Sequence, residues 1–352
     1  MSIILKGNNI SSNNNGIGPG EVTNIKASQN ASSIILSWAN PSNVIIYGTT
    51  LSTFDHVIIV KNESRYPTSI KDGNTIYSGN GTTCSDSNVI KNKKYYYRFF
   101  VYDTNKLCNN NINMIIENTF YGVDPILKNN TWEQIAAASE SGIASSLWKV
   151  GDEIDLTLSG DFNETVTLQI WDFNHFDKSD GSGKAGICFG MKNLMNDSKA
   201  LNSYDHGNYG GWNDSAMRNT VMQNILKSIP SNLRSYIKEV NTYANKGGDS
   251  SSSSKGLLSK DKVFIPGFTE IFGPSVWISQ SKTESNQKQF PIFTDNNSRI
   301  KKMSNGSGDA YFWWTRSPSY NDTNCFCNVN TDGSDNYYSV IGSYGVCFCF
   351  NV

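Results

Sequence analysis

Short stretches in which apolar and polar residues alternate are the feature that most constrains the fold of this chain. Ser33–Trp38, Phe54–Val60 and Tyr95–Tyr102 are rich in β-branched and aromatic residues, and Asn, Pro and Gly lie between them. Successive side chains of a strand point to opposite faces, so this pattern is typical of strands rather than helices. It predicts an all-β sandwich over residues 21–104. Residues 1–20, rich in Asn, Ser and Gly, are expected to form a flexible arm.

The predicted sandwich resembles a fibronectin type III domain at two places. Trp38 in Leu36-Ser-Trp38 matches the core tryptophan of that family, and Val89–Tyr95 matches its tyrosine corner. In this corner Asn92 replaces the usual glycine and Lys91 the usual proline. After Tyr95, alternate residues of the run to Val101 are expected to point inward. The resemblance implies a spacer or adhesion module that carries no chemistry of its own.

Residues 105–130 are predicted to be a linker, and residues 131–352 a second domain of the α+β class. Thr131 and Gln134 have the spacing of a capping box, which predicts a short helix after Thr131. The apolar spacing over Leu233–Val240 favours another helix. Strands are expected mainly toward the C-terminus. There, Tyr311–Val352 alternates aromatic and polar residues between Asn, Asp and Gly turns, and from Ser319 it contains no Lys, Arg, Glu, Gln, His, Trp or Met. Such a composition is typical of a recognition surface.

The second domain resembles a C-type-lectin-like fold, which formylglycine-generating enzymes share with the variable proteins of diversity-generating retroelements. The motifs that carry this resemblance are Trp132–Ile135, Trp148–Asp152, Gly210–Asn213, Trp313–Pro318 and Val329–Gly333. It implies a ligand-binding domain whose variable region spans about residues 319–349. Retroelements rewrite adenines, and adenine substitution in Asn codons can produce every residue type found from Ser319 to Val352.

Two sets of residues follow from this resemblance. Those expected to face solvent, to vary and to bind the ligand are Tyr320, Asp322, Cys325, Asp335, Tyr337, Tyr338, Ser339, Ile341 and Cys347. Those expected to be structural, Trp38 and Tyr95 in the sandwich and the others in the second domain, are Trp38, Tyr95, Trp212, Trp313, Trp314, Arg316 and Gly333. For Arg316 we expect hydrogen bonds to the carbonyls of the turn that follows it.

Charge and apolar content bear on the partners. The net charge of -1 gives no electrostatic reason to expect nucleic acid or an anionic membrane as a partner. No apolar run approaches the roughly 20 residues that span a bilayer, and the N-terminus shows no secretory signal. The resemblance to variable proteins of retroelements instead implies a host cell-surface protein or glycan as partner, and other virion or tail proteins that the N-terminal region would contact.

The sequence does not fix the chemical role of the cysteines. Their number, seven, is odd, which argues against a fully paired disulfide framework. Cys84, Cys108 and Cys188 are isolated and are expected to be buried. The pairs Cys325/Cys327 and Cys347/Cys349 have strand spacing, so they are compatible with zinc or cross-strand disulfides if the strands are neighbours, and otherwise with reduced cysteines.

No metal, cofactor or catalytic residue is expected. The Gly183-Lys184 turn lacks the spacing of a phosphate loop, and the Asn328–Gly333 segment has Ser339 where a calcium loop needs Glu. Three histidines show no catalytic spacing. The expected function is thus that of a non-catalytic receptor-binding protein at a phage tail tip, diversified by a retroelement, and the resemblance to diversified tail proteins implies a homotrimer. The alternatives are a bacterial surface adhesin of the same fold and a formylglycine-generating-type oxidase.

Overall fold

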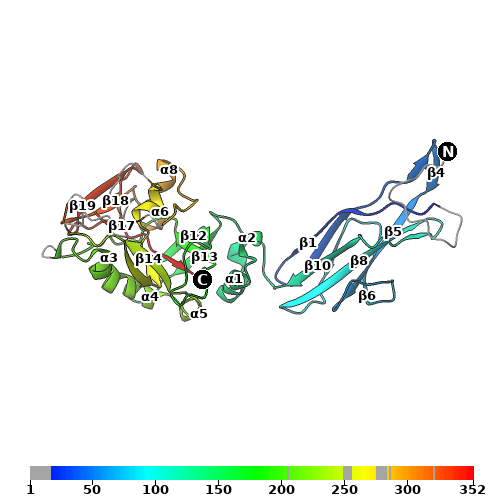
Figure 1. The fold of residues 1–352 in the computed structure, drawn as a ribbon, viewed down its shortest axis with the longest axis horizontal. Helices are drawn as coiled ribbons and strands as arrows, with labels where there is room; N and C mark the ends of the chain where they lie inside the picture. Colours follow the sequence, from blue (N-terminus) through cyan, green and yellow to red (C-terminus); the bar gives the residue numbers. More distant parts are fainter. Residues whose placement is uncertain (1–16, 204–205, 249–255, 275–283, 285–286, 320–321) are drawn as a thin grey trace. The chain divides into compact units, whose positions relative to one another are not determined.

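The computed structural model describes residues 17–203, 206–248, 256–274, 284, 287–319 and 322–352. The chain forms two compact units, Met1–Pro125 and Ile126–Val352, which are described separately below and drawn in Figure 1. Within the described ranges, no helix is both long and apolar enough to cross a membrane.

The first unit is a β-sandwich of two antiparallel sheets (Figure 1). One sheet has the order β1-β2-β7, with β1 (Thr23–Gln29), β2 (Ile34–Ala39) and β7 (Thr83–Asp86). The other has the order β10-β8-β5-β6, with β5 (Phe54–Asn62), β6 (Asn74–Gly79), β8 (Lys93–Asp103) and β10 (Ile115–Phe120). A separate hairpin joins β3 (Val44–Ile46) and β4 (Thr49–Ser52). The predicted all-β sandwich is confirmed.

Two residues predicted from the sequence lie at the centre of this sandwich. Trp38 is buried, and its ring packs edge-on against Tyr77 at 5.1 Å and Phe99 at 5.4 Å. The hydroxyl of Tyr95 accepts a hydrogen bond from the backbone N–H of Ile90 at 2.8 Å, which is the geometry of a tyrosine corner. Asn92 has a φ of 61°, so it takes the left-handed conformation for which glycine is usual. The strand order and this corner together give a fibronectin type III-like fold.

The sandwich extends into the segment that was predicted to be a linker. Within residues 105–130 lie β9 (Cys108–Asn109) and β10, and both pair with β8. β10 continues the sheet from Ile115 to Phe120 because its residues satisfy the free edge of β8. The expectation of a linker from residue 105 is therefore wrong, and the first unit ends at Pro125.

A buried ion pair joins the two sheets, and nothing in the sequence pattern indicates it. The ammonium of Lys61 on β5 lies 2.8 Å from the Asp86 carboxylate on β7, and both side chains are almost fully buried. Asp86 also accepts a hydrogen bond from the Tyr97 hydroxyl at 2.9 Å. The mutual attraction and the added hydrogen bond offset part of the cost of burying the two charges.

The second unit combines short helices with antiparallel sheets (Figure 1). Its helical segments are η1 (Leu127–Asn129), α1 (Trp132–Glu140), α2 (Ala144–Leu147), α3 (Gly211–Asp214), the π-helix η3 (Met217–Met222), α4 (Gln223–Ser228), α5 (Ser231–Arg234), α6 (Phe268–Phe272), α8 (Asn296–Arg299) and η4 (Ser304–Gly306). Its strands are β11 (Glu153–Thr157), β12 (Thr165–Phe173), β13 (Ile187–Met191), β14 (Val240–Ala244), β15 (Leu257–Asp261), β16 (Val263–Phe264), β17 (Trp313–Pro318), β18 (Cys325–Val329), β19 (Asp335–Ser339) and β20 (Cys349–Asn351).

The chain end closes the main sheet of this unit. The sheet has the order β11-β12-β13-β20-β16, so the C-terminal strand β20 lies between strands from the middle of the chain. Beyond β20, Val352 and Ile187 exchange backbone hydrogen bonds at 3.0 and 3.2 Å. A second sheet has the order β17-β18-β19. The C-type-lectin-like assignment of this unit stays a prediction.

Local signals predicted some of the helices and not others. α1 begins at the expected capping box, in which the Thr131 hydroxyl and the Gln134 side chain each accept from the other residue's backbone N–H. The helix expected over Leu233–Val240 is wrong. Only the short α5 forms there, because the chain turns and Val240 begins β14, which pairs with β15.

Candidate ligand-binding face

The sheet β17-β18-β19 carries most of the residues that the sequence singled out for binding. Its hairpin pairing sets Cys325 opposite Ser339 and Val329 opposite Asp335. The three strands differ in burial: β17 and β18 are buried throughout, whereas β19 is half-buried to exposed. The outer strand β19 and the turn after it therefore form the accessible part of this sheet.

Two tryptophans at the start of β17 fix the inner edge of the sheet. Trp313 and Trp314 are both fully buried. The indole N–H of Trp313 donates to the Arg299 carbonyl at 3.1 Å, and that of Trp314 donates to the Lys199 carbonyl at 2.8 Å. In each indole the apolar ring is buried and the N–H is hydrogen-bonded, so both tryptophans fix the position of the strand.

Arg316 is the centre of a buried polar network. Its guanidinium donates to the carbonyls of Tyr243 at 3.1 Å and Ile265 at 3.0 Å, to the side-chain oxygen of Gln287 at 2.9 Å, and to both oxygens of Glu270. Arg316 and Glu270 are fully buried. The sequence predicted that Arg316 holds the following turn, and this is wrong. The side chain instead joins β17 to β14, to Ile265 just after β16, and to α6, since a long planar group can reach several elements.

A second buried carboxylate lies beside this network. Glu284 is fully buried, accepts from the Thr269 backbone N–H at 3.1 Å and accepts from the Ser317 hydroxyl. Burial raises the pKa of Glu284, and its hydrogen bond from Ser317 and the charge of Arg316 oppose that rise. The positive charge of the Arg316 guanidinium thus acts on two buried carboxyl groups, those of Glu270 and Glu284.

The turn after β18 depends on a glycine. Gly333 has a φ of 79°, and a Cβ atom built at this position would lie 1.9 Å from the backbone oxygen of Asn296. Only glycine avoids both the strained conformation and the clash. Trp212, the remaining predicted structural residue, is buried and its indole N–H donates to the Asp261 carboxylate at 2.9 Å.

Asn208 anchors the loop between β17 and β18, and sequence reasoning missed it. Its side-chain amide donates to the carbonyls of Ser319 at 3.1 Å, Asp322 at 2.8 Å and Cys325 at 2.9 Å. Its side-chain oxygen accepts from the Gly248 N–H at 2.7 Å. An Asn within a Gly- and Asn-rich stretch gives no periodic signal, so only the fold identifies this role.

The exposed predicted residues gather on β19 and the following turn. Tyr337 is 38% exposed and Ile341 is 48% exposed, and Ser339 is also exposed. Asp335 and Tyr338 are half-buried. We call these five residues the candidate face, although along β19 Tyr338 points to the side of the sheet opposite Asp335, Tyr337 and Ser339. Asp322, in the preceding loop, is half-buried as well, and Tyr320 lies outside the described residues.

Two of the predicted solvent-facing residues are not on the surface. Cys325 and Cys347 are buried. Cys325 lies on the central strand β18, between two neighbouring strands, and Cys347 packs where its thiol contacts the Met191 carbonyl at 3.7 Å. The prediction that these two cysteines face solvent is therefore wrong, because their side chains are packed in the interior.

The two Cys-x-Cys pairs lie in different sheets. Cys325 and Cys327 belong to β18, whereas Cys349 belongs to β20 in the main sheet, with Cys347 just before it. All the cysteines are free thiols. Burial is the main cause that raises the pKa of Cys325 to about 12 and that of Cys347 to about 11. Over the described part of the chain, no group of His, Cys, Asp and Glu is arranged to hold a metal ion.

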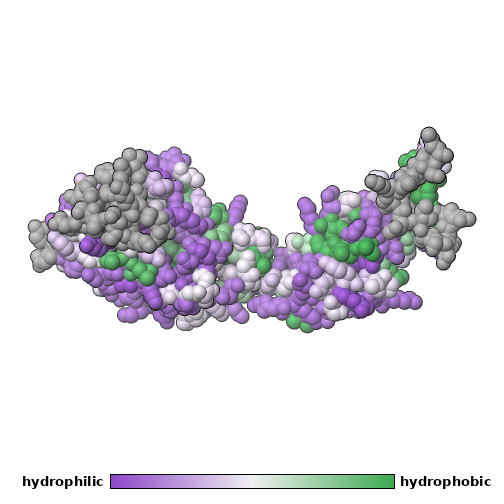
Figure 2. Space-filling view, viewed as in Figure 1, coloured by the Kyte–Doolittle hydropathy of each residue, from purple (hydrophilic) through white to green (hydrophobic). Residues whose placement is uncertain are grey.

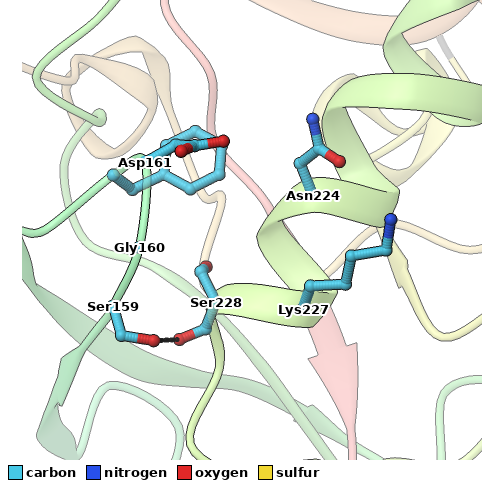
Figure 3. Close-up of a pocket in the computed structure, with 7 residues that line it drawn as sticks. Ser159, Gly160, Asp161, Asn224, Lys227 and Ser228 are labelled. Carbon is cyan, nitrogen blue, oxygen red and sulfur yellow. Dashed lines mark hydrogen bonds between the residues drawn. The ribbon is translucent and has the colours of Figure 1, made fainter.

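Outside this sheet, the second unit has a surface pocket and a buried histidine. The pocket, shown in Figure 3, has a volume of about 160 Å³ and is lined by Ser159, Asp161, Asn224, Lys227 and Ser228. The figure shows the Asp161 and Lys227 side chains apart, with no hydrogen bond drawn between them. Elsewhere, the His175 ring is within 2.8 Å of Asp172 and stacks on Phe290 at 4.0 Å. The His175 ring is therefore packed in the core.

On the face drawn in Figure 2, the coloured surface is mostly hydrophilic, and its hydrophobic patches are separate from one another. Scattered exposed apolar side chains are normal in folded proteins. The candidate face is distinguished by its two tyrosines and by its position beside the buried strands β17 and β18.

Comparisons with known proteins give limited information. Residues 190–352 match a family described as "Domain of unknown function (DUF6273)", a range that includes the candidate face. No curated protein matches the chain. Among solved structures, the sixth fibronectin type III domain of human fibronectin type III domain containing protein 3 has a TM-score of 0.24 and 10% identity, covering 31% of this chain and 91% of that one. The spore cortex lytic enzyme SleM of Clostridium perfringens has a TM-score of 0.21 and 12% identity, covering 30% of this chain and 29% of that one. Such low scores carry no argument, so the sandwich assignment rests on strand order and core.

Proposed function

We propose that this protein is a non-catalytic receptor-binding protein that captures a host surface protein or glycan through the candidate face. The observation that carries the proposal is the exposure of Tyr337 on the outer strand β19 and of Ile341 in the turn after it, in a sheet whose other strands β17 and β18 are buried throughout. Tyrosine supplies a large contact area and loses little conformational entropy on binding. A rigid frame keeps that area preorganised for a partner.

The proposed setting is a phage tail tip, with the second unit as a C-type-lectin-like head and the first unit as a spacer that contacts other tail proteins. A homotrimer is the proposed assembly, since several copies multiply a modest single-site affinity. The second candidate setting is a bacterial surface adhesin. Sedimentation equilibrium tests the assembly, and a monomer at micromolar concentration would contradict it.

Retroelement diversification is part of the proposal, and it now concerns the exposed positions only. Substitution at Tyr337, Ser339 and Ile341 would change the surface without disturbing the interior, unlike substitution at Cys325 or Cys347. The nucleotide sequence around the gene tests this point. A near-identical repeat that differs at adenines, next to a reverse transcriptase gene, is expected; the absence of both would refute diversification.

Binding is tested with labelled full-length protein on a panel of bacterial cells by flow cytometry. The double variant Tyr337→Ala/Ile341→Ala is expected to lose at least about tenfold in binding, because aromatic and apolar anchors dominate interfaces. Its melting temperature should change little. Tyr209→Ala is the matched control, since Tyr209 is 57% exposed but lies outside the candidate face. Unchanged binding of the double variant, or a large loss of stability, would sink the assignment of this face.

A further inference from the structure

A cluster of aromatic rings covers one side of the sheet β17-β18-β19. We define the aromatic cluster as Phe312, Trp314, Tyr338 and Tyr344. Ring centroids are 5.2 Å apart for Phe312 and Tyr338, 4.9 Å for Trp314 and Tyr344, and 5.0 Å for Tyr338 and Tyr344. Trp314 is fully buried and the other three rings are half-buried. The cluster thus reaches from the interior to the surface.

Asn328 lies under this cluster. It is opposite Trp314 on one neighbouring strand and Asn336 on the other, and paired residues of an antiparallel sheet share a face. Phe312 precedes β17 on one flank of β18, and Tyr338 lies in β19 on the other flank. Because the rings of Phe312 and Tyr338 meet edge to face, they cross over β18 and cover Asn328. This arrangement accounts for the complete burial of Asn328.

The side-chain amide of Asn328 has no hydrogen-bond partner for either its nitrogen or its oxygen among the described residues. The side chain of neighbouring Asn336 differs, since it donates to Asn330 at 3.2 Å and accepts from the Tyr337 backbone N–H at 2.8 Å. A buried amide without partners is unfavourable, and such groups usually meet a water molecule or a ligand. A suitable ligand group must both donate and accept a hydrogen bond.

Resting on the proposed function, we infer that the aromatic cluster and Asn328 form a subsite for an N-acetylhexosamine unit of a neutral glycan. The apolar face of the pyranose ring packs on Tyr338 and Tyr344. The acetamido group offers one N–H and one carbonyl, which match the free oxygen and nitrogen of Asn328. A few placed polar groups within an aromatic lining are typical of small-molecule sites.

The charges around the cluster favour a neutral sugar over an anionic one. The charged residue paired with Tyr344 along the backbone is Lys199, and its ammonium lies 3.6 Å from the Asp197 carboxylate. Burial first, and then Tyr338, Tyr311 and Cys325, raise the pKa of Tyr344, so its hydroxyl stays neutral at pH 7. The subsite therefore offers hydroxyl, amide and ring surfaces to the sugar.

Entry of the sugar requires a side-chain movement. Asn328 is covered, so the ring of Tyr338 must turn outward before the acetamido group reaches the amide. Tyr338 lies on the outer strand β19 and is half-buried, so this rotation leaves the frame of β17 and β18 in place. Binding would then change the surroundings of the Trp314–Tyr344 pair, which gives a fluorescence signal.

The test uses the full-length chain and triacetylchitotriose as the probe, with cellotriose as the matched sugar that lacks acetamido groups. Binding is measured by saturation-transfer NMR and by titration of tryptophan fluorescence. We expect chitotriose to bind at least about tenfold more tightly than cellotriose, the worth of about one hydrogen bond. Asn328→Ala should remove this preference without lowering the melting temperature. Asn324→Ala, at an exposed amide before β18, is the control.

A second variant keeps the test decisive if Asn328→Ala does not fold. Tyr344→Leu retains apolar volume but removes a stacking ring, and it should weaken binding of both sugars by about tenfold. No binding of chitotriose up to about 10 mM overturns the subsite, as does a chitotriose preference that survives Asn328→Ala. Cell binding that is lost in Tyr337→Ala/Ile341→Ala but kept in Asn328→Ala overturns the subsite alone. Cell binding that neither variant changes overturns the proposed function too.

Discussion

Replacing Arg316 by Met should destabilise the second unit more than any surface change, because it leaves a buried carboxylate unpaired. Arg316 and Glu270 are fully buried, and after the substitution Glu270 keeps only the backbone N–H of Gly267, at 2.9 Å, among its recorded donors. Breaking a buried pair from one side costs about 3–5 kcal/mol. At about 2–4 °C per kcal/mol for a domain of this size, the melting temperature should fall by about 6–20 °C.

The assay is thermal unfolding followed by tryptophan fluorescence, which reports the second unit because only Trp38 of the eight tryptophans lies in the first. The double variant Arg316→Met/Glu270→Gln should recover part of the loss, since Gln is neutral and can still accept from Gly267. Lys192→Met is the control: its pair with Glu153 is exposed, so it should cost less than about 1 kcal/mol. A double variant that is less stable than the single one would refute the unpaired-charge explanation.

Three further predictions concern the same unit. Gly160→Ala should cost roughly 1 kcal/mol of stability, and Gly333→Ala should cost several times more. Both glycines have a left-handed φ, but only at Gly333 would a Cβ atom clash with backbone. Equal melting temperatures of the two variants would contradict this clash. The pKa of Glu284 is raised by burial, so its protonated form is favoured in the folded state, and stability should fall as the pH rises from 4.5 through the raised value. Glu284→Gln should abolish that fall, and an unchanged pH profile of unfolding would count against it. Alkylation without reductant should modify every cysteine once the chain is unfolded. In the native state the fully buried thiols should react slowly, because burial raises their pKa. Intact mass measures the number of alkyl groups added, and fewer additions than cysteines in denaturant would indicate disulfides.

Local patterns predicted the elements whose structure depends on neighbours in sequence. The alternation around Trp38 and Tyr95 determines which faces are buried, and a tyrosine corner needs only a few adjacent residues. The capping box at Thr131 determines where α1 begins. The same local reasoning failed over Leu233–Val240, where pairing of Val240 with Asp261 on a distant strand outweighs the helical spacing.

The candidate site shows the limits of composition. Tyr337, Ser339 and Ile341 are exposed as the sequence suggested, whereas Cys325 and Cys347 are equally reachable by adenine substitution and are buried. Composition cannot separate these cases because exposure depends on whether a strand is central or outer in its sheet. Asn208 and Asn328 give no sequence signal for the same reason.

The sequence alone thus determined that the chain has a β-sandwich followed by a second domain, because strand alternation and turn residues act over a few positions. Only the tertiary structure decided which strand of the C-terminal sheet is outermost, how Arg316 and Glu270 pair, and why Asn328 is covered by rings from both flanks of β18. Those outcomes depend on contacts between residues far apart in the chain, and burial and hydrogen bonding there are properties of the assembled fold.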